Sequence, residues 1–361
     1  MAFSLSVEAR YASSLISHLQ SKKLVDKGRK ISDISGHVHV PIVAKSKYES
    51  LSISEKVSHE IGSEVSVSEI ELPTRQKKMN FKDHLSKILS EDELSLVKTS
   101  YDVVGDLAVV EIDEELRDKE KTIAEALIES NKSVKGVFRK SGSHTGRFRT
   151  QKMKHLAGVR RKETVHRENN VRLKLDIEKV YFSARQSTER KRVSSLVKRG
   201  ENVIVLFSGC APFPCVIAKN SDVNDVCAVE VNPVGHDYAL KNIGLNKLSN
   251  VYAFNRDASD LSGIRSDIDK VFGSDMYFDR VVMPHPTDAI SYIDTAIALS
   301  SGKSVIHFYK FSEEGKEKDD YSLLKNTLKE KGVSPRLIRT VRCGQHSPGV
   351  NRVCFDVSIR R

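Results

Sequence analysis

A run of apolar residues that breaks into a glycine turn indicates the fold of this chain. The stretch Val203-Ile-Val-Leu-Phe-Ser-Gly-Cys-Ala-Pro-Phe-Pro214 is followed by Val226-Cys-Ala-Val-Glu-Val231. Continuous apolar runs of this kind are typical of parallel strands whose two faces are both covered by helices. Gly209 permits a tight turn beside a ligand, and Pro214 suits the first turn of a helix. We therefore expect an α/β domain with a doubly wound parallel sheet.

The acid at the end of the second strand indicates the kind of ligand. Glu230 stands at the carboxyl end of its strand, where doubly wound sheets bind ligands and where an acid commonly holds ribose hydroxyls. The preceding turn lacks the Gly-x-Gly-x-x-Gly pattern of dinucleotide sites, and its single glycine leaves no evident pyrophosphate cradle. This favours a nucleoside ligand without phosphates, such as S-adenosylmethionine. The alternative is an ordinary strand-to-helix turn of any α/β domain.

Three units follow one another along the chain. Residues 1–72 combine a helical pattern at 7–24 with two strand-like runs, which predicts a small α/β module. The polar, proline-led stretch 73–78 predicts a linker. Residues 79–180 carry a helical pattern followed by short strands, which predicts a second small α/β unit. In residues 181–361 strands and helices alternate and end in two adjoining strands, which predicts the doubly wound domain with an antiparallel hairpin at its edge.

The basic residues are concentrated in one part of the chain. Residues 131–200 contain 21 Lys and Arg against five Asp and Glu, whereas the whole chain has 59 against 48. Such a basic belt on an otherwise mildly acidic protein is typical of nucleic-acid binding. A solvated basic face is the alternative explanation.

Other classes of protein are disfavoured by composition. No apolar run approaches the roughly 18–20 residues of a membrane span, and the first residues lack the features of a signal peptide. The five cysteines are an odd number and mostly stand in apolar strands, which fits a reducing cytoplasm. His37 and His39 share a strand face but have no third metal ligand at a recognisable spacing. We expect a cytoplasmic monomer that has no metal centre and does not contact a membrane.

Further motifs lie on both sides of the glycine turn. They are Asp102-Val-Val-Gly-Asp106, Arg147-Phe-Arg-Thr-Gln-Lys-Met-Lys-His-Leu-Ala-Gly158, His166-Arg-Glu-Asn169, Asp176 through Tyr181-Phe-Ser183, Thr188-Glu-Arg190 and Met283-Pro-His-Pro286. With Phe207-Ser-Gly-Cys-Ala-Pro-Phe213 and Glu230-Val-Asn-Pro233, this order resembles the archaeal and eukaryotic type of tRNA (guanine-N1)-methyltransferase. The resemblance covers most of the chain, most firmly residues 100–310. The N-terminal module agrees with the small domain of that family that contacts the tRNA elbow.

The resemblance implies a class I, Rossmann-like S-adenosylmethionine-dependent methyltransferase domain preceded by two smaller α/β RNA-contacting domains. The implied reaction is methyl transfer to N1 of the guanosine at tRNA position 37, next to the anticodon. The implied catalytic residues are Glu189 as the general base and Arg149 as the donor to guanine O6. The implied cofactor residues are Arg185, Phe207, Gly209, Glu230, Asn232 and Asp257. The implied substrate residues are Arg147, Ser183 and Pro284.

The chemistry requires the residue types found at the two catalytic positions. Guanine N1 carries a proton at neutral pH, so a positioned carboxylate has to remove that proton before N1 becomes a good nucleophile. The electrons left behind delocalise onto O6, where a cationic donor stabilises them. Structural alternatives exist for each residue: a helix-start acid for Glu189, a phosphate contact for Arg149 and a helix cap for Asp257.

Three positions depart from the family pattern. Val205 replaces a common acid, Ala211 replaces a glycine, and Pro284 replaces an asparagine that helps to orient guanine. Two other functions stay open. One is the wybutosine-pathway enzyme that transfers the aminocarboxypropyl group of the same cofactor at the same nucleotide. Because that transfer needs no N1 deprotonation, the presence of both Arg149 and Glu189 argues against it. The other is a non-catalytic tRNA-binding protein, which a measurement of cofactor binding would distinguish.

Overall fold

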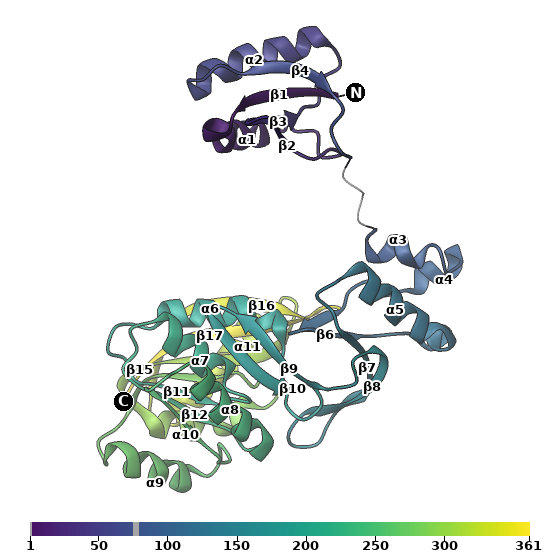
Figure 1. Ribbon diagram of the computed structural model, residues 1–361. Coiled ribbons are helices and arrows are strands. Elements are labelled where there is room, and N and C mark those ends of the chain that lie inside the picture. The colour runs from purple at the N-terminus through teal and green to yellow at the C-terminus, as the bar shows by residue number, and fades with distance from the viewer. Residues whose placement is uncertain (1, 75–78) are drawn as a thin grey trace. The chain divides into compact units, whose positions relative to one another are not determined.

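The computed structural model describes residues 2–74 and 79–361, without the side chains of 143–145, and has two compact units, Met1–Met79 and Asn80–Arg361 (Figure 1). The boundary falls directly after the predicted linker 73–78, of which residues 75–78 lie outside the described residues. Among the described helices, none combines the length and apolar character needed to cross a membrane.

The first unit is a four-stranded antiparallel sheet covered by two helices. The sheet has the order β2-β3-β1-β4, and Leu5, Leu15 and Val57 lie in one core between the sheet and the helices. Its elements are β1 (Ala2–Glu8), η1 (Ala9–Tyr11), α1 (Ala12–Ser21), β2 (Ser32–Ile34), β3 (His37–Pro41), α2 (Lys47–Ile61) and β4 (Ser66–Ile70).

The first unit differs from the sequence prediction in two places. The helix expected at residues 7–24 begins only at Ala12. Residues Ala2–Glu8 form a strand instead, because apolar and polar residues alternate in this segment. Helix α2 was not predicted, because it buries Ser50 and Ser54 beside Val57 and therefore has no clear apolar stripe. The residues at the two ends of α2 could have indicated a helix in the sequence. Ser46 caps the first turn, and Gly62 ends the last turn in the left-handed conformation.

The second unit starts with a four-stranded sheet of order β5-β6-β7-β8 and a separate two-stranded hairpin, β9–β10. The elements of this part are α3 (Phe81–Leu85), α4 (Glu91–Leu96), β5 (Asp102–Val104), β6 (Leu107–Val110), η2 (Glu114–Lys119), α5 (Glu120–Ser130), β7 (Gly136–Thr145), β8 (Thr150–Gly158), β9 (Glu163–Glu168) and β10 (Val171–Asp176). Residues 146–149, which are basic and contain Gly146, form the turn between β7 and β8. Strands β8 and β9 were not predicted, because basic residues interrupt their apolar alternation.

The remaining chain forms a seven-stranded sheet with helices on both faces. The order is β13-β12-β11-β14-β15-β17-β16, and all the strands run parallel except β17, which is antiparallel to both of its neighbours, β15 and β16. The expected antiparallel hairpin at the edge is therefore confirmed. The elements are η3 (Ala184–Gln186), α6 (Ser187–Leu196), β11 (Val203–Leu206), α7 (Pro212–Asn220), β12 (Val226–Val229), α8 (Pro233–Leu245), β13 (Val251–Phe254), α9 (Leu261–Phe272), β14 (Phe278–Met283), η4 (Ala289–Tyr292), α10 (Ile293–Leu299), β15 (Ser300–Glu313), α11 (Glu317–Glu330), β16 (Ser334–Ser347) and β17 (Val350–Arg360).

Alternate residues of β11 serve two different cores. Ile204 and Leu206 pack with residues of α9, α10 and α11, whereas Val203 and Val205 pack with residues of α6 and α7. The chain runs outward from β11 to β13 and then crosses to β14 on the other side of β11. This is a topological switch point, where open α/β sheets bind ligands at the carboxyl ends of their strands.

The expected boundary between residues 180 and 181 lies inside the second compact unit. One hydrophobic cluster joins Phe138 of β7 and Leu173 of β10 to Cys215 of α7. The buried side chain of Asn242 on α8 accepts from Lys174 N at 2.7 Å and donates to Lys174 O and Cys210 O. These shared contacts make residues 80–361 one packed body. The division into an RNA-contacting domain at 79–180 and a methyltransferase domain at 181–361 stays a prediction.

Candidate active site

The turn after β11 has an unusual backbone. Phe207, Gly209 and Ala211 all have positive φ, at 59°, 57° and 63°. Only glycine adopts this region without steric cost, so the two other residues are held there by their surroundings. Ala211, one of the three departures seen in the sequence, is fully buried and precedes Pro212 at the start of α7. The turn thereby brings its backbone amides and the Ser208 side chain to the end of the strand.

Glu230 closes this turn from the neighbouring strand. Its Oε2 accepts from Gly209 N at 2.6 Å, and its Oε1 accepts from Asn232 N at 2.8 Å. Burial raises the pKa of Glu230, and the backbone donors oppose that rise only in part. Each carboxylate oxygen can accept a further hydrogen bond. The carboxylate is therefore placed to bind a ligand with adjacent hydroxyl groups.

Asn232 contributes to this region through its backbone. Its Oδ1 accepts from Val234 N at 3.0 Å and so caps α8, and its Nδ2 donates to Lys179 O at 2.9 Å. The side chain expected to contact the cofactor therefore fixes the end of β12 against the segment before residue 181. Its amide N–H, which holds Glu230, is its contribution to the site.

The tip of the β7–β8 hairpin reaches the same region. Arg147 forms an ion pair with Asp257, which follows β13 and also accepts from Ser259 N at 2.8 Å. Arg149 donates to Thr287, and its guanidinium carbon lies 6.0 Å from the centroid of the Tyr181 ring. Two residues of the basic belt thus lie at the mouth of the switch-point crevice.

Aromatic rings form the wall on the side of β14. The Phe207 ring lies 4.9 Å from the His285 ring and 4.8 Å from the Tyr292 ring, measured between centroids. Burial, and next the charge of Arg149, lowers the pKa of His285, so this wall carries no charge of its own near neutral pH. Pro284 lies beside these rings in the lining of the pocket.

These elements enclose one pocket, which we call the central pocket. Nine of the eleven residues singled out from the sequence line it: Arg147, Arg149, Ser183, Phe207, Gly209, Glu230, Asn232, Asp257 and Pro284. The sequence reasoning missed Ser208, whose buried Oγ has no hydrogen-bond partner among the residues that the structure describes. It also gave no role to Arg190, which is buried, binds Glu168 at 2.5 Å and holds the Ser183 carbonyl at 3.0 Å.

Arg185 does not join the central pocket. Its Nε forms an ion pair of 2.5 Å with Asp102 of β5, and its side chain is 66% exposed. Both residues line a second, adjoining cavity, which shares Arg149 and Tyr181 with the central pocket. The ion pair with Asp102 orients the guanidinium of Arg185 toward the β5–β8 sheet. A contact between Arg185 and the cofactor therefore stays a prediction.

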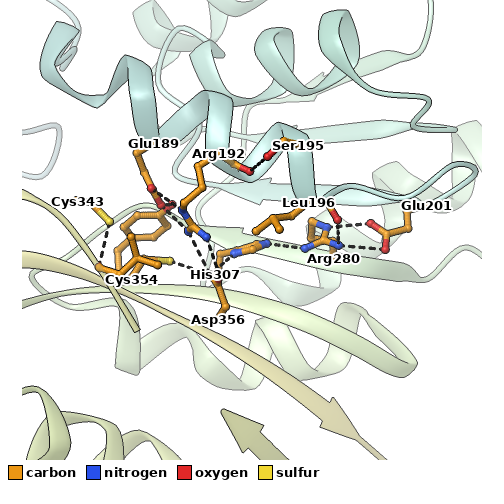
Figure 2. A network of polar contacts seen from close by, with 12 residues as sticks. Glu189, Arg192, Ser195, Leu196, Glu201, Arg280, His307, Cys343, Cys354 and Asp356 are labelled. Atoms are coloured by element: carbon orange, nitrogen blue, oxygen red, sulfur yellow. Dashed lines mark hydrogen bonds and ion pairs between the residues drawn. The ribbon is translucent and has the colours of Figure 1, made fainter. Parts of the chain in front are cut away.

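Glu189 also lies outside the lining of both cavities. The side chain is 5% exposed, and both oxygens are bound by Arg192, with Nε–Oε2 and Nη2–Oε1 distances of 2.7 Å (Figure 2). Tyr309 Oη donates to Oε1 at 2.5 Å. The carboxylate proposed as the base is thus held in a buried ion pair behind the wall of the site.

The ion pair continues into a network across the sheet (Figure 2). Arg192 Nη1 binds Asp356 Oδ2 at 2.6 Å, and Asp356 Oδ1 lies 2.6 Å from Nδ1 of His307. His307 Nε2 lies 2.7 Å from Arg280 Nη1, and Arg280 binds Glu201 at 2.9 Å. The signal in the sequence was the spacing of Arg192 three residues after Glu189, but the other partners come from distant strands.

A metal ion is not suited to this network. His307, Cys354 and Asp356 present possible ligand atoms within 4.8 Å of one another. However, Arg192 and Arg280 bind Asp356 and His307 directly, so a divalent cation there would lie between two guanidinium groups. We assign these side chains to the ion-pair network.

Comparisons with known proteins indicate the family to which this chain belongs. A sequence model of the TRM5/TYW2 methyltransferase domain matches residues 164–334, and one of the TYW2 N-terminal domain matches residues 81–161. The chain is 38% identical to tRNA (guanine(37)-N(1))-methyltransferase Trm5b of Pyrococcus abyssi over 60% of this chain and 61% of that protein. It is 35% identical to the Methanocaldococcus jannaschii protein of the same name, over 66% of this chain and 67% of that one.

Another relative carries a different activity in its name. The tRNA(Phe) (4-demethylwyosine(37)-C(7)) aminocarboxypropyltransferase of Pyrococcus horikoshii is 27% identical over 79% of this chain and 98% of that protein. Among solved structures, wild-type Trm5b from Pyrococcus abyssi superposes with a TM-score of 0.73 at 28% identity and full coverage of both chains. A structure described as the complex of aTrm5 and tRNALeu gives 0.67 at 27% identity, with 99% of each chain covered.

Proposed function

The chain belongs to the TRM5/TYW2 methyltransferase family, and from that premise we propose that it transfers the methyl group of S-adenosylmethionine to N1 of the guanosine at tRNA position 37. The observation that carries the proposal is that Glu230 and Arg149 line the same pocket. Glu230 is the acid expected to bind the ribose of the cofactor. Arg149 is a cation of the basic belt and is expected to contact the guanine of the tRNA. A cofactor and an RNA nucleotide can therefore meet in this pocket.

The central pocket fits the cofactor. Glu230 has acceptor capacity left for the ribose hydroxyls, and Asp257 lies after the next strand, in the lining of the same pocket. Its carboxylate now pairs with Arg147, so an adenine amino group would take the place of that guanidinium. The unpartnered hydroxyl of buried Ser208 calls for a polar ligand atom. When bound, S-adenosylmethionine supplies an electrophilic methyl group on its sulfonium sulfur.

The chain's own residues have three tasks in this reaction. Arg149 at the hairpin tip donates hydrogen bonds to guanine O6, so that the charge developing there is stabilised. The guanine enters the pocket between Ser183 and Pro284. Arg190 fixes the position of Ser183 by donating a hydrogen bond to its carbonyl. Glu189 takes the N1 proton, which requires that its buried carboxylate gain access to the pocket, whose lining does not include Glu189.

The second candidate is aminocarboxypropyl transfer at the same nucleotide. It is favoured by the match of residues 81–161 to a TYW2 N-terminal domain and by the relative of that activity. Pro284 also removes a side chain that would orient guanine. The presence of Arg149 and Glu189 supports the methyl transfer instead, because only that reaction has to remove the N1 proton.

One assay separates these reactions. Purified protein is incubated with a tRNA that has guanosine at position 37 and, separately, with a tRNA that has 4-demethylwyosine there. Each tRNA is tested once with cofactor labelled in the methyl group and once with cofactor labelled in the aminocarboxypropyl chain. We expect label from the first cofactor only, recovered as 1-methylguanosine. Label from the second cofactor would identify aminocarboxypropyl transfer. Cofactor binding without transfer of either label to guanosine or 4-demethylwyosine transcripts would identify a non-catalytic protein.

A further inference from the structure

The buried network behind the site has a feature that stability alone does not explain. Arg192 uses its Nε and Nη2 on Glu189 and its Nη1 and Nη2 on Asp356, so one guanidinium bridges α6 to β17 (Figure 2). Its side chain is 16% exposed, and those of Glu189 and Asp356 are 5% and 3% exposed. Buried ion pairs of this kind are often no more stabilising than apolar residues of the same volume. The arrangement therefore calls for a role beyond stability.

The hydrogen bonds define the protonation state of the network. Arg280 can only donate, so Nε2 of His307 accepts from it, and Nδ1 carries the proton that is donated to Asp356. His307 is thus neutral, and burial lowers its pKa accordingly. Burial raises the pKa of Tyr309 well above its ordinary value, so Tyr309 is also neutral.

The network contains more carboxylates than guanidinium groups. Its carboxylates belong to Glu189, Asp356 and Glu201, and its guanidinium groups belong to Arg192 and Arg280. Glu189 therefore shares its guanidinium partner, Arg192, with Asp356.

Glu189 is connected to the linings of both cavities through its neighbours. Tyr309, which donates to Glu189, packs edge-on against Phe213 in the lining of the central pocket, with 6.1 Å between ring centroids. Cys343, which interacts with the same carboxylate, lines the adjoining cavity. A change at Arg192 is therefore transmitted to the substrate region through Glu189.

We propose that Arg192, anchored by Asp356, is the positioning residue of Glu189 and sets the orientation from which this carboxylate takes the N1 proton of guanine. This inference rests on the proposed function. In the step, the N1–H bond of guanine breaks, an O–H bond forms on Glu189, and the electron pair stays on the purine. Arg192 does not touch the substrate, so its effect on the rate passes entirely through Glu189.

A double-mutant cycle tests the proposal. The single-turnover rate of methyl transfer to a tRNA transcript is measured at saturating cofactor and tRNA for the wild type, Arg192→Gln, Glu189→Gln and the double variant. Misplacement of a reacting group by about 1 Å costs roughly 100-fold, so we expect a fall of that order for Arg192→Gln. Residues that act as a unit are non-additive. The double variant should therefore be within about threefold of Glu189→Gln.

The conservative variant Arg192→Lys covers the case in which Arg192→Gln fails to fold. Lysine keeps the charge but cannot bind both carboxylate oxygens and Asp356 at once. We expect an intermediate rate in the wild-type background, no further loss in the Glu189→Gln background, and unchanged dissociation constants for S-adenosylmethionine and tRNA.

Arg265 provides a matched control outside the site. It is partly buried on α9 and donates to Asp269 at 2.8 Å and to Met276 O at 2.6 Å. Arg265→Gln should lower thermal stability but leave the single-turnover rate unchanged in both backgrounds.

The outcomes distinguish the two claims. Equal rates for the double variant and Glu189→Gln support the positioning role. A rate loss from the Arg192 variants that multiplies with the loss from Glu189→Gln would contradict it and leave the methyltransferase function intact. A wild-type protein that transfers no methyl group would overturn the proposed function and this inference together.

Discussion

The backbone N–H of Gly209 donates to Oε2 of Glu230 at 2.6 Å, and this bond joins the two strand ends on which the site is built. The turn after β11 and the acid after β12 are therefore one structural unit, although 21 residues separate them. Because Glu230 is also held by Asn232 N, its carboxylate is preorganised before a ligand arrives. A preorganised acceptor binds hydroxyl groups without a further ordering cost.

Loss of this carboxylate should weaken cofactor binding. Glu230→Ala removes two charge-assisted hydrogen bonds to the ribose, each worth about 1.5–3 kcal/mol, so the dissociation constant for S-adenosylmethionine should rise at least about tenfold. Isothermal titration calorimetry measures the change. Asp225→Asn is the matched control, because it alters an acid directly before β12, at the opposite end of the same strand. Equal affinities for the wild type and Glu230→Ala would place the ligand elsewhere.

The basic belt should make tRNA binding sensitive to salt. Each phosphate that a cation neutralises adds about one unit to the slope of log affinity against log salt concentration. Arg160 is exposed at the end of β8, so Arg160→Ala should weaken tRNA binding and reduce this slope by about one. Lys329 on α11, outside the belt, serves as the control. A slope near zero for the wild type would contradict the prediction that the basic belt binds the phosphates of tRNA.

His307 should make the stability of the second unit depend on pH. Burial lowers its pKa in the folded state, so the unfolded chain binds a proton that the folded chain does not bind as the pH falls below about 6.5. Acidification below this pH therefore lowers the free energy of unfolding of the second unit, by up to about 1.4 kcal/mol per pH unit. Urea unfolding between pH 7 and 5 should show a shallower loss for His307→Gln than for the wild type. Parallel curves would mean that His307 is protonated in the fold.

The contacts of Asn242 should make residues 80–361 unfold as one body. Its side chain makes three hydrogen bonds, two with the backbone N–H and carbonyl of Lys174 on β10 and one with the carbonyl of Cys210 in the glycine turn. Asn242→Ala leaves these buried groups unpaired, at a cost of roughly 2–3 kcal/mol. Chemical unfolding of residues 80–361, produced without the first compact unit, should show one transition by both near- and far-ultraviolet circular dichroism, and Asn242→Ala should lower its midpoint. Two separate transitions of this fragment without the substitution would indicate that the β5–β10 segment is an independent domain.

Local patterns were sufficient to predict part of the fold and of the site. The β11 turn, Glu230 and the closing hairpin follow from apolar runs, a glycine and strand spacing, and the structure confirms these elements. Helix α2 escaped prediction because its buried face contains serines. Nine site residues came from motif resemblance, and the structure brings them to one pocket.

The environment of Glu189 could not be predicted in the same way. Its partners Tyr309 and Asp356 come from β15 and β17, and the Arg192–Asp356 contact spans 164 residues. No periodicity in the sequence reports such a contact, because it depends on the order in which the strands assemble. Arg185 illustrates the same limit, since its orientation is decided by Asp102, which is 83 residues earlier in the chain.

The central claim, that methyl transfer here depends on a carboxylate that removes the guanine N1 proton, is tested most directly by single-turnover rates across pH for the wild type, Glu189→Gln and Arg149→Ala. Glutamine keeps the size of Glu189 but cannot accept the proton, so we predict a rate about 10²–10⁴-fold lower at pH 7 with unchanged tRNA affinity. The deficit should shrink as the pH rises toward the pKa of guanine N1, because solvent then removes the proton, whereas Arg149→Ala should be slower at every pH. A Glu189→Gln enzyme with a near wild-type rate at pH 7 would contradict the claim.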